Sequence, residues 1–198
     1  LSLGVSHSCG IETSGLVQCW GLDENGWLTP PSGMFTFLSS GEGYSCGIDT
    51  SGSIQCWGFS RWGGQHHTLY GQPWSFFPGT FNAISIGYDH GCGIDTSGSV
   101  QCWLSDMFGQ STPPSGTFNA ITSGTHHSCG IDTSGSVQCW GTAFGDLTNP
   151  PSGTFRSIST GTGHSCGIDS SGTVQCWGGD YYGESTAPIN FRPGINGH

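Results

Sequence analysis

The feature that most constrains the fold is an internal repeat. Five segments can be aligned over the 198 residues, at 1–37, 38–83, 84–120, 121–157 and 158–198. Each contains a version of HSCGIDTSGSVQCWG, and none shows an apolar period of about 3.6 residues. Gly or Pro interrupts every stretch long enough for a helix. The repeat therefore excludes helical solenoids and predicts a single domain, residues 1–198, built from five copies of one small unit.

Within each repeat the pattern predicts a β-hairpin of defined register. If Cys129 faces Cys139, then Ile131 faces Val137, and residues 133–135 (Thr-Ser-Gly) form a three-residue loop. Gly is expected at the end of such a loop, where a left-handed residue follows a type I turn. Alternation places the cysteines with Ile131 and Val137 on one face, and the Trp that follows the second cysteine on the other. Both faces carry bulky groups, so we expect both to be buried.

A third strand precedes the hairpin, at residues 118–123 (FNAITS) and at the equivalent residues 81–86 and 155–160. A sheet that is buried on both faces and recurs about every 40 residues is typical of a propeller blade. The predicted fold class is therefore an all-β propeller of five short blades, each with three or four antiparallel strands and one hairpin disulfide.

The pattern G-Q-x-x-x-P…F-x-x-I-x-x-G-x-x-H-S-C-x-I-x-x-x-G-x-V-x-C-W-G resembles the regulator of chromosome condensation repeat. It is most similar to the short, cysteine-bearing form found in large bacterial surface and secreted proteins. The resemblance covers essentially the whole chain and implies propellers, commonly seven-bladed, that act as interaction platforms. Known roles of the family are nucleotide exchange on a small GTPase and inhibition of β-lactamase. The basic face of the chromatin-binding member is absent here, so that activity is not expected.

Five repeats leave the closure of the propeller open. The first repeat lacks the lead-in sequence of the others, and residues 190–195 (NFRPGI) are a degenerate copy of it. In a closed five-bladed ring this C-terminal strand would complete the first blade. In an open arc it would complete the first blade of a second molecule, which gives head-to-tail self-assembly. The ring is favoured because closure removes exposed strand edges.

Each hairpin carries two cysteines at facing positions, where Cβ separations of about 4.5–5.5 Å permit a disulfide after small adjustment. Zinc is the rival hypothesis, but no C-x2-C spacing is present and each hairpin keeps its own pair. Disulfides indicate an oxidising compartment, and hence an extracellular or cell-surface location. The predicted pairs are Cys9–Cys19, Cys46–Cys56, Cys92–Cys102, Cys129–Cys139 and Cys166–Cys176.

Charge and hydropathy exclude two kinds of partner. Thirteen acidic and three basic residues give a formal net charge of -10. Three scattered arginines cannot neutralise a run of phosphates, so nucleic-acid binding is excluded. No apolar run approaches the ~20 residues of a membrane-spanning helix.

Two motifs match catalytic or metal patterns by chance. G-x-S-x-G occurs at residues 43–47 and 163–167, but there it enters a hairpin beside a cysteine and not a strand-to-helix elbow. D-x-S-x-S occurs at residues 49–53, where ordinary turn chemistry explains it better than a metal site. We therefore expect no catalytic residue, no metal and no cofactor.

Two aromatic positions recur in the repeats and are interpreted as structural. A histidine, or Tyr44 in the second repeat, precedes the first cysteine by two residues, and recurrence favours packing or a hydrogen bond between blades. A tryptophan follows the second cysteine, and we expect it in the core between blades. The recurring residues are His7, Tyr44, His90, His127 and His164, and Trp20, Trp57, Trp103, Trp140 and Trp177.

Differences between repeats are more informative about ligands. The second repeat has nine extra residues within 59–77, and aromatic faces beside hydrogen-bonding groups commonly grip sugars or proteins. A self-packed loop or a subunit contact is the alternative for this segment. Its candidate residues are Arg61, Trp62, His66, His67, Tyr70 and Trp74. A second set of aromatics near loop-tip glycines would suit a multivalent lectin, or would fill shallow clefts between blades: Trp27, Trp62, Phe108, Phe144 and Tyr182.

The Ser/Thr/Pro-rich linkers are candidates for O-glycosylation, although turn chemistry also explains their composition. The candidate positions are Thr29, Ser32, Ser111, Thr112, Ser115, Thr148 and Ser152. The sequence as a whole favours a non-enzymatic extracellular scaffold, namely a surface, adhesion or filament-forming module. Its partner would be itself or surface glycans and proteins. The alternative is a carbohydrate-binding lectin that uses the 59–77 loop or the loop aromatics.

Overall fold

The computed structural model describes residues 1–24, 26–58, 78–142 and 146–187. In these residues the chain forms five three-stranded antiparallel sheets, one for each repeat and each in simple up-and-down order, and no α-helix. The all-β fold with one blade per repeat is therefore confirmed. The sheets are β1 (Ser2–Leu3), β2 (His7–Ile11) and β3 (Val17–Gly21); β4 (Phe35–Ser40), β5 (Tyr44–Asp49) and β6 (Ile54–Gly58); β7 (Phe81–Ile86), β8 (His90–Asp95) and β9 (Val100–Leu104); β10 (Phe118–Ser123), β11 (His127–Asp132) and β12 (Val137–Gly141); and β13 (Phe155–Thr160), β14 (His164–Asp169) and β15 (Val174–Gly178).

The hairpin register follows the spacing of the cysteines. Cys129 pairs with Cys139 and Ile131 with Val137, as predicted, and the other four hairpins repeat this register. Gly135 ends the turn at φ 88°, a left-handed conformation that favours glycine. All ten cysteines form the five predicted disulfides and none is free, so the zinc hypothesis is wrong.

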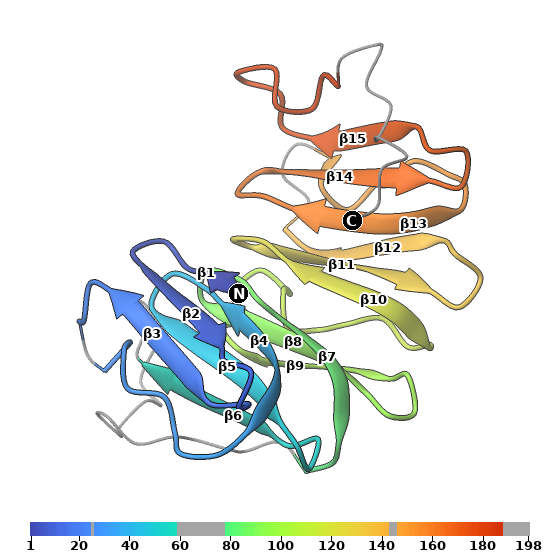
Figure 1. Ribbon diagram of the computed structural model, residues 1–198. Helices are drawn as coiled ribbons and strands as arrows, with labels where there is room; N and C mark the ends of the chain where they lie inside the picture. The colour runs from blue at the N-terminus through green and yellow to red at the C-terminus, as the bar shows by residue number, and fades with distance from the viewer. Residues whose placement is uncertain (25, 59–77, 143–145, 188–198) are drawn as a thin grey trace.

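The five sheets follow one another along an arc, with the first sheet at one end and the last at the other (Figure 1). The innermost strands contact their neighbours in sequence, β1 with β4, β4 with β7, β7 with β10 and β10 with β13. The ring closure that the edge argument favours is therefore not observed in the described part of the chain. Residues 190–195, proposed as the closing strand, lie outside the described residues.

Each junction between blades buries one face of a sheet against the opposite face of the next. At the fourth junction, Cys129, Ile131 and Val137 of one blade pack against Phe155 and Trp177 of the next. The same Cys–Ile face meets the same aromatic face at the other three junctions. Burial of both faces, expected from the alternation, thus arises from stacking blade on blade.

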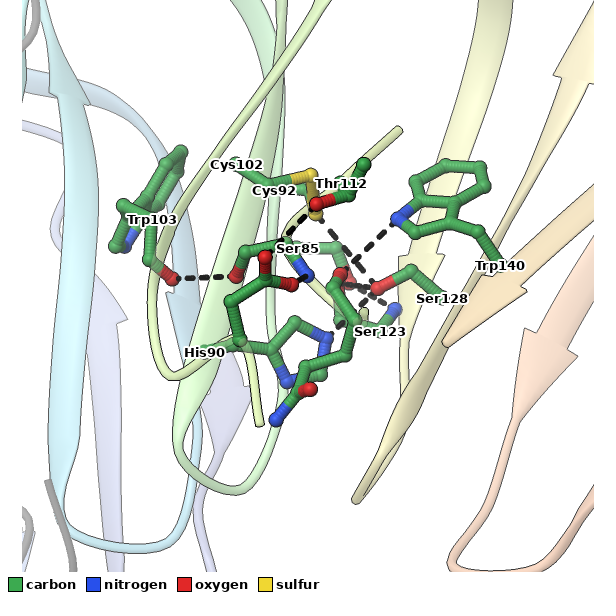
Figure 2. Close-up of a disulfide and its surroundings, with 12 residues drawn as sticks. Ser85, His90, Cys92, Cys102, Trp103, Thr112, Ser123, Ser128 and Trp140 are labelled. Atoms are coloured by element: carbon green, nitrogen blue, oxygen red, sulfur yellow. Dashed lines mark hydrogen bonds between the residues drawn. A yellow bond between two sulfur atoms is a disulfide. The ribbon is translucent and has the colours of Figure 1, made fainter. Parts of the chain in front are cut away.

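A buried histidine adds a polar link to three of these junctions. His90 Nε2 lies 2.7 Å from Ser128 Oγ of the next blade, and Ser128 Oγ also donates to Ser123 Oγ (Figure 2). The equivalent pairs His7–Ser45 and His127–Ser165 are both 2.8 Å apart. A hydrogen bond between blades, expected from the recurrence of the histidine, is therefore confirmed at these positions.

At the remaining junction, between the second and third blades, both the histidine and its serine partner are replaced. Tyr44 occupies the histidine position, and Gly91 occupies the serine position of the following blade. A Cβ atom on Gly91 would lie 2.7 Å from the Trp103 indole and 2.8 Å from Ile86. The larger phenol at one position is thus accompanied by the loss of a side chain at the other. Burial together with the Asp89 charge raises the pKa of Tyr44 well above its usual value.

Four of the five recurring tryptophans are buried between blades, with 2–6% of their surface exposed. For Trp20 the expectation of a core position is wrong, because 51% of its surface is exposed. The other tryptophans face a preceding blade. Trp20 belongs to the blade at the end of the arc, so its burial could not follow from its own repeat.

Candidate functional site

Two loops that follow the third strand of a blade have closely similar sequences. DMFGQST starts at Asp106 after β9, and DYYGEST starts at Asp180 after β15. Equivalent strands run in the same direction in every blade, so equivalent loops leave the arc on the same face. Both loops combine sequence differences with exposed apolar side chains.

Hydrogen bonds hold the first loop in one conformation. Asp106 accepts bonds of 2.8 Å from the Ser111 amide and from the Thr112 hydroxyl. The side chain of Gln110, which is fully buried, accepts a 2.8 Å bond from the Phe108 amide. An Asp that bonds backbone and side chain across a turn fixes it without help from a neighbouring element.

The second loop repeats each of these contacts with its own residues. Asp180 accepts 2.7 Å bonds from the Ser185 amide and the Thr186 hydroxyl, and these bonds lower its pKa. Glu184 takes the place of glutamine and accepts a 2.7 Å bond from the Tyr182 amide. The two loops therefore share one set of hydrogen bonds, which we call the loop frame, and differ in the residues at the tip.

The frame exposes two large apolar residues at the tip of each loop. Met107 is 84% exposed and Phe108 41%, while Tyr181 is 90% exposed and Tyr182 98%. Gly109 and Gly183 follow the tips with φ of 79° and 85°, where a side chain would be strained. We call these residues, 107–108 and 181–182, the tip pairs. Apolar side chains on loops that are already fixed lose little conformational freedom when a partner binds.

Among the loop aromatics singled out from the sequence, Phe108 and Tyr182 are exposed at tips and Trp27 is not. Trp27 is 7% exposed and its ring lies 5.6 Å from that of His7. The sequence reasoning missed Met107 and Tyr181. The spacing D-x-x-G-x-S-T marks both tip pairs and could have found them.

The candidate ligand residues of the long insertion, Arg61, Trp62, His66, His67, Tyr70 and Trp74, lie outside the described residues, as does Phe144. Their role remains a prediction from the sequence.

The G-x-S-x-G serines are structural. Ser45 and Ser165 are fully buried, and each bonds to a histidine of the preceding blade. These Ser–His pairs resemble a nucleophile with its base, but no substrate can reach a hydroxyl enclosed between two sheets. Burial lowers the pKa of His127 to about 4, so this ring stays neutral at physiological pH.

The D-x-S-x-S segments form the hairpin turns. Asp132 accepts bonds from the amides of Ser134 (2.9 Å) and Ser136 (3.0 Å) and from the hydroxyl of Ser134 (2.5 Å). Such bonds stabilise the carboxylate and lower the pKa of Asp169 to about 2 in the equivalent turn. Across the described residues, no group of three or more His, Cys, Asp or Glu side chains is arranged to hold a metal ion.

An open hollow of about 500 Å³ lies on the inner side of the arc and is lined by residues from all five blades. Its lining is mostly glycine backbone and short side chains. Leu3, Ile86, Glu42 and Tyr88 contribute the larger side chains, and a hydrogen bond to Glu42 raises the pKa of Tyr88. The hollow lacks the convergent polar groups that mark most small-molecule sites.

The candidate glycosylation positions differ in how far their hydroxyls are engaged. Ser111 is half-buried and donates to the carbonyl oxygens of Trp103 and Ser105, and Thr112 donates to Asp106. Thr148 is half-buried. The exposed candidates are Thr29, Ser32, Thr112, Ser115 and Ser152, and of these the Thr112 hydroxyl is engaged by Asp106.

Comparison with known proteins agrees with this architecture. Residues 155–184 match the regulator of chromosome condensation (RCC1) repeat family. No curated protein sequence matches the chain.

Several solved structures share the fold. The ectodomain of the Physcomitrella patens receptor kinase CR4 has 27% identity and a TM-score of 0.71, covering 89% of this chain and 48% of that one. The CRINKLY WD40 ectodomain of the Arabidopsis thaliana receptor kinase ACR4 has 24% identity and a TM-score of 0.73, covering 89% and 64%. Prp20p of Saccharomyces cerevisiae, described by its binding to Gsp1p and histones, has 18% identity and a TM-score of 0.75, covering 89% and 56%.

The chain thus spans between about half and two thirds of the length of these structures. The match in sequence lies in the last blade, and the match in fold extends over the arc of five. Together they identify the molecule as a series of blades, each with its own disulfide, that resemble the RCC1 repeat and have the RCC1-like propeller fold.

Proposed function

We propose that this chain is a protein-binding scaffold that works outside the cell and uses its tip pairs as the contact surface. RCC1-like propellers are interaction domains, and the described residues add a surface suited to that role. The observation that carries the proposal is the shared loop frame. Two loops with the same hydrogen bonds hold different apolar pairs in the open, at Met107–Phe108 and Tyr181–Tyr182.

The chemistry of the tip pairs favours a protein as ligand. Methionine and aromatic residues are enriched in protein–protein interfaces, and a small number of them carries most of the binding energy. Two pairs on the same face of one arc also allow bivalent contact, which strengthens binding without further residues. A rigid framework with variable loops is a common solution for recognition.

The disulfides support an extracellular setting. Five bridges would be reduced in the cytosol, whereas they persist in secreted proteins. The similarity to two receptor-kinase ectodomains points in the same direction, although Prp20p shares the fold as well. No helix in the described residues is long and apolar enough to cross a membrane.

Carbohydrate binding is the second candidate function. It rests on the aromatic and polar composition of residues 59–77, including Trp62 and Trp74. Exposed tyrosines such as Tyr181 and Tyr182 also suit stacking against sugar rings, so the tip pairs do not by themselves separate the two functions.

Array binding with paired variants separates the two functions. The oxidised protein is applied to an array of extracellular protein domains and to a glycan array, as wild type and as Met107→Ser/Phe108→Ser and Tyr181→Ser/Tyr182→Ser. We expect binding to protein domains that falls at least tenfold in both variants. Phe37→Ser is the matched control, because Phe37 is 42% exposed but lies on β4, away from the loops.

Glycan binding that is lost in Trp62→Ala or Trp74→Ala would support the lectin instead. Protein binding that is unchanged in both tip-pair variants would contradict the proposed contact surface. If the protein bound to neither the protein array nor the glycan array, both functions would be contradicted.

A further inference from the structure

The innermost strands of four blades each contain a β-bulge at their second residue. In β10, Phe118 pairs with Asp132 and Ala120 with Ile131, so Asn119 between them has no partner in the ladder. A bulge turns a side chain out of the regular alternation, and bulges are common beside binding and active sites. The equivalent bulge residues of β4, β7 and β13 are Thr36, Asn82 and Arg156.

The four bulge residues differ in the hydrogen bonds that their side chains form. The Thr36 hydroxyl and the Arg156 guanidinium each donate to a backbone carbonyl oxygen of their own blade. The amides of Asn82 and Asn119 are exposed and have no hydrogen-bond partner among the residues that the structure describes. Each of these two amides therefore keeps its N–H donors and its carbonyl acceptor free for a ligand.

Asn82 and Asn119 line the same hollow, of about 450 Å³, between the third and fourth blades. This volume lies within the range of about 300–1,000 Å³ that is typical of small-molecule sites. Ile94 and Phe118 form part of its floor, and each is only 3% exposed, so the surface that the hollow offers is mainly polar. Four hydroxyl-bearing residues also line it, namely Thr96, Ser97, Thr117 and Thr133.

Hydrogen bonds across the junction hold the hollow in shape. The Phe118 amide of the fourth blade donates to the Gly98 carbonyl of the third, at 2.8 Å. The Thr133 amide donates to the Thr117 carbonyl at 3.1 Å, and the hydroxyls of the same two residues lie 3.2 Å apart. The backbone that lines the hollow is thus fixed before a ligand binds, which lowers the entropic cost of binding.

Neighbouring junctions carry larger or charged side chains at equivalent positions. Phe37 stands at the second junction where the third has Ala83, and Arg156 stands at the fourth where the third has Asn119. The third junction thus combines a small residue at one position with an uncharged amide at the other. Of the described residues that line the hollow, none is ionisable, although the chain carries a net charge of -10.

A hollow that offers amides and hydroxyls without charge restricts the class of ligand. An ion would lose its hydration there without gaining a counter-charge. A peptide would find no exposed apolar or aromatic anchor of the kind that dominates protein interfaces, because Ile94 and Phe118 are buried. A sugar hydroxyl both donates and accepts hydrogen bonds, and a primary amide presents both complementary groups.

We infer that the hollow between the third and fourth blades binds a neutral saccharide, held chiefly by the Asn82 and Asn119 amides. The site lies on the face of the arc opposite to the tip pairs, because the hairpin turns that border it precede the third strand of a blade and the tip loops follow that strand. It is separate from residues 59–77, on which the carbohydrate-binding alternative rests. Saccharide binding here goes beyond the proposed protein contact and leaves the tip pairs free.

A glycan array that carries neutral, sialylated and sulfated glycans tests the site. We expect the oxidised protein to bind neutral glycans, with an apparent affinity at least tenfold lower in Asn82→Leu/Asn119→Leu, which keeps side-chain size and removes the hydrogen-bonding groups. Ala83→Phe should lower the affinity as much, because it places in the hollow the residue that the second blade has at this position. Thr36→Val is the matched control, since it alters a bulge residue outside the hollow.

Circular dichroism and the number of disulfides check that each variant folds, and Ala83→Phe provides the test if the asparagine variant does not. Neutral-glycan binding that persists in both hollow variants would overturn the inference, as would a preference for charged glycans or no glycan binding at all. Loss of protein-domain binding instead of glycan binding in the hollow variants would also overturn it. Glycan binding should be unchanged in Met107→Ser/Phe108→Ser, so failure of the proposed protein contact would leave this site standing.

Discussion

The histidines between the blades couple stability to pH. His127 is fully buried, and burial is the largest cause of its lowered pKa, followed by the charges of His90, His164 and His126. An unfolded histidine titrates near pH 6.5, whereas folded His127 titrates at about 4. Above about pH 6.5 neither form binds a proton, so this group contributes no pH dependence there. Below that pH the unfolded chain gains a proton that the folded chain cannot take up, and stability falls until about pH 4.

We therefore expect the free energy of unfolding to fall as the pH is lowered from about 7 to about 5. His127 alone should contribute about 2 kcal/mol of this loss. His127→Gln removes the titrating group and should flatten the dependence, whereas His126→Gln is the control at the neighbouring residue. Urea unfolding at both pH values measures the difference. The same pH dependence in His127→Gln as in wild type would show that other groups are responsible.

The junction of Tyr44 with Gly91 makes a separate prediction at the residue scale. A Cβ atom on Gly91 would lie 2.7 Å from Trp103, so Gly91→Ala should destabilise the protein by about 1–3 kcal/mol through overpacking. Gly10→Ala is the matched control, because a Cβ there would lie 3.6 Å from Trp20, an ordinary contact. Chemical denaturation compares the two variants.

The paired replacement of histidine by Tyr44 and of serine by Gly91 can also be tested by reversing it. Tyr44→His combined with Gly91→Ser restores the pair found at the other junctions. It should be more stable than Gly91→Ser alone, because the smaller ring leaves room for the hydroxyl. Equal stability of the two variants would mean that the two positions do not interact.

At the scale of the element, the hairpin is the unit that the sequence specifies most completely. The cysteine spacing and the turn glycine determine the register, and β10 and β13 begin and end where the sequence predicts. These features depend on residues within one repeat. The partner of His90 could not be predicted in the same way, because Ser128 lies 38 residues away in another blade. The exposure of Trp20 could not be predicted from its own repeat either, since its burial depends on a neighbouring blade.

The disulfides should stabilise their hairpins to different extents. Cys129–Cys139 and Cys166–Cys176 both span a sequence separation of 10, so the chain-entropy contribution is about 3 kcal/mol for each. Cys129 is fully buried and packs with Phe155 and Trp177 of the next blade, whereas Cys166 is half-buried. Replacing both cysteines of a pair by Ala should therefore cost about 1–2 kcal/mol more at Cys129–Cys139, because contacts with the next blade are lost too.

Thermal or denaturant unfolding of the two double variants provides the measurement. Because the loops are of equal length, the difference between the variants isolates the packing contribution. Equal losses of stability would show that the bridges act through the unfolded chain alone.

At the scale of the whole molecule, the blades form a linear series of similar units. Such proteins gain stability from each unit and from each interface with a neighbour. The second, third and fourth blades have two interfaces each. Among the described residues, the first and last blades each have one, which agrees with exposed Trp20 and half-buried Cys166 at the two ends.

This difference between inner and terminal blades predicts that protection of backbone amides from hydrogen exchange varies along the arc. Backbone amides of β5, β8 and β11, the central strands of the inner blades, should exchange with solvent more slowly than those of β14 in the last blade. The reason is that a terminal blade can open by breaking one interface, while an inner blade must break two. Native-state hydrogen exchange, measured by mass spectrometry at low protein concentration, follows each strand separately. Uniform exchange in all five blades would show that the arc unfolds as one cooperative unit.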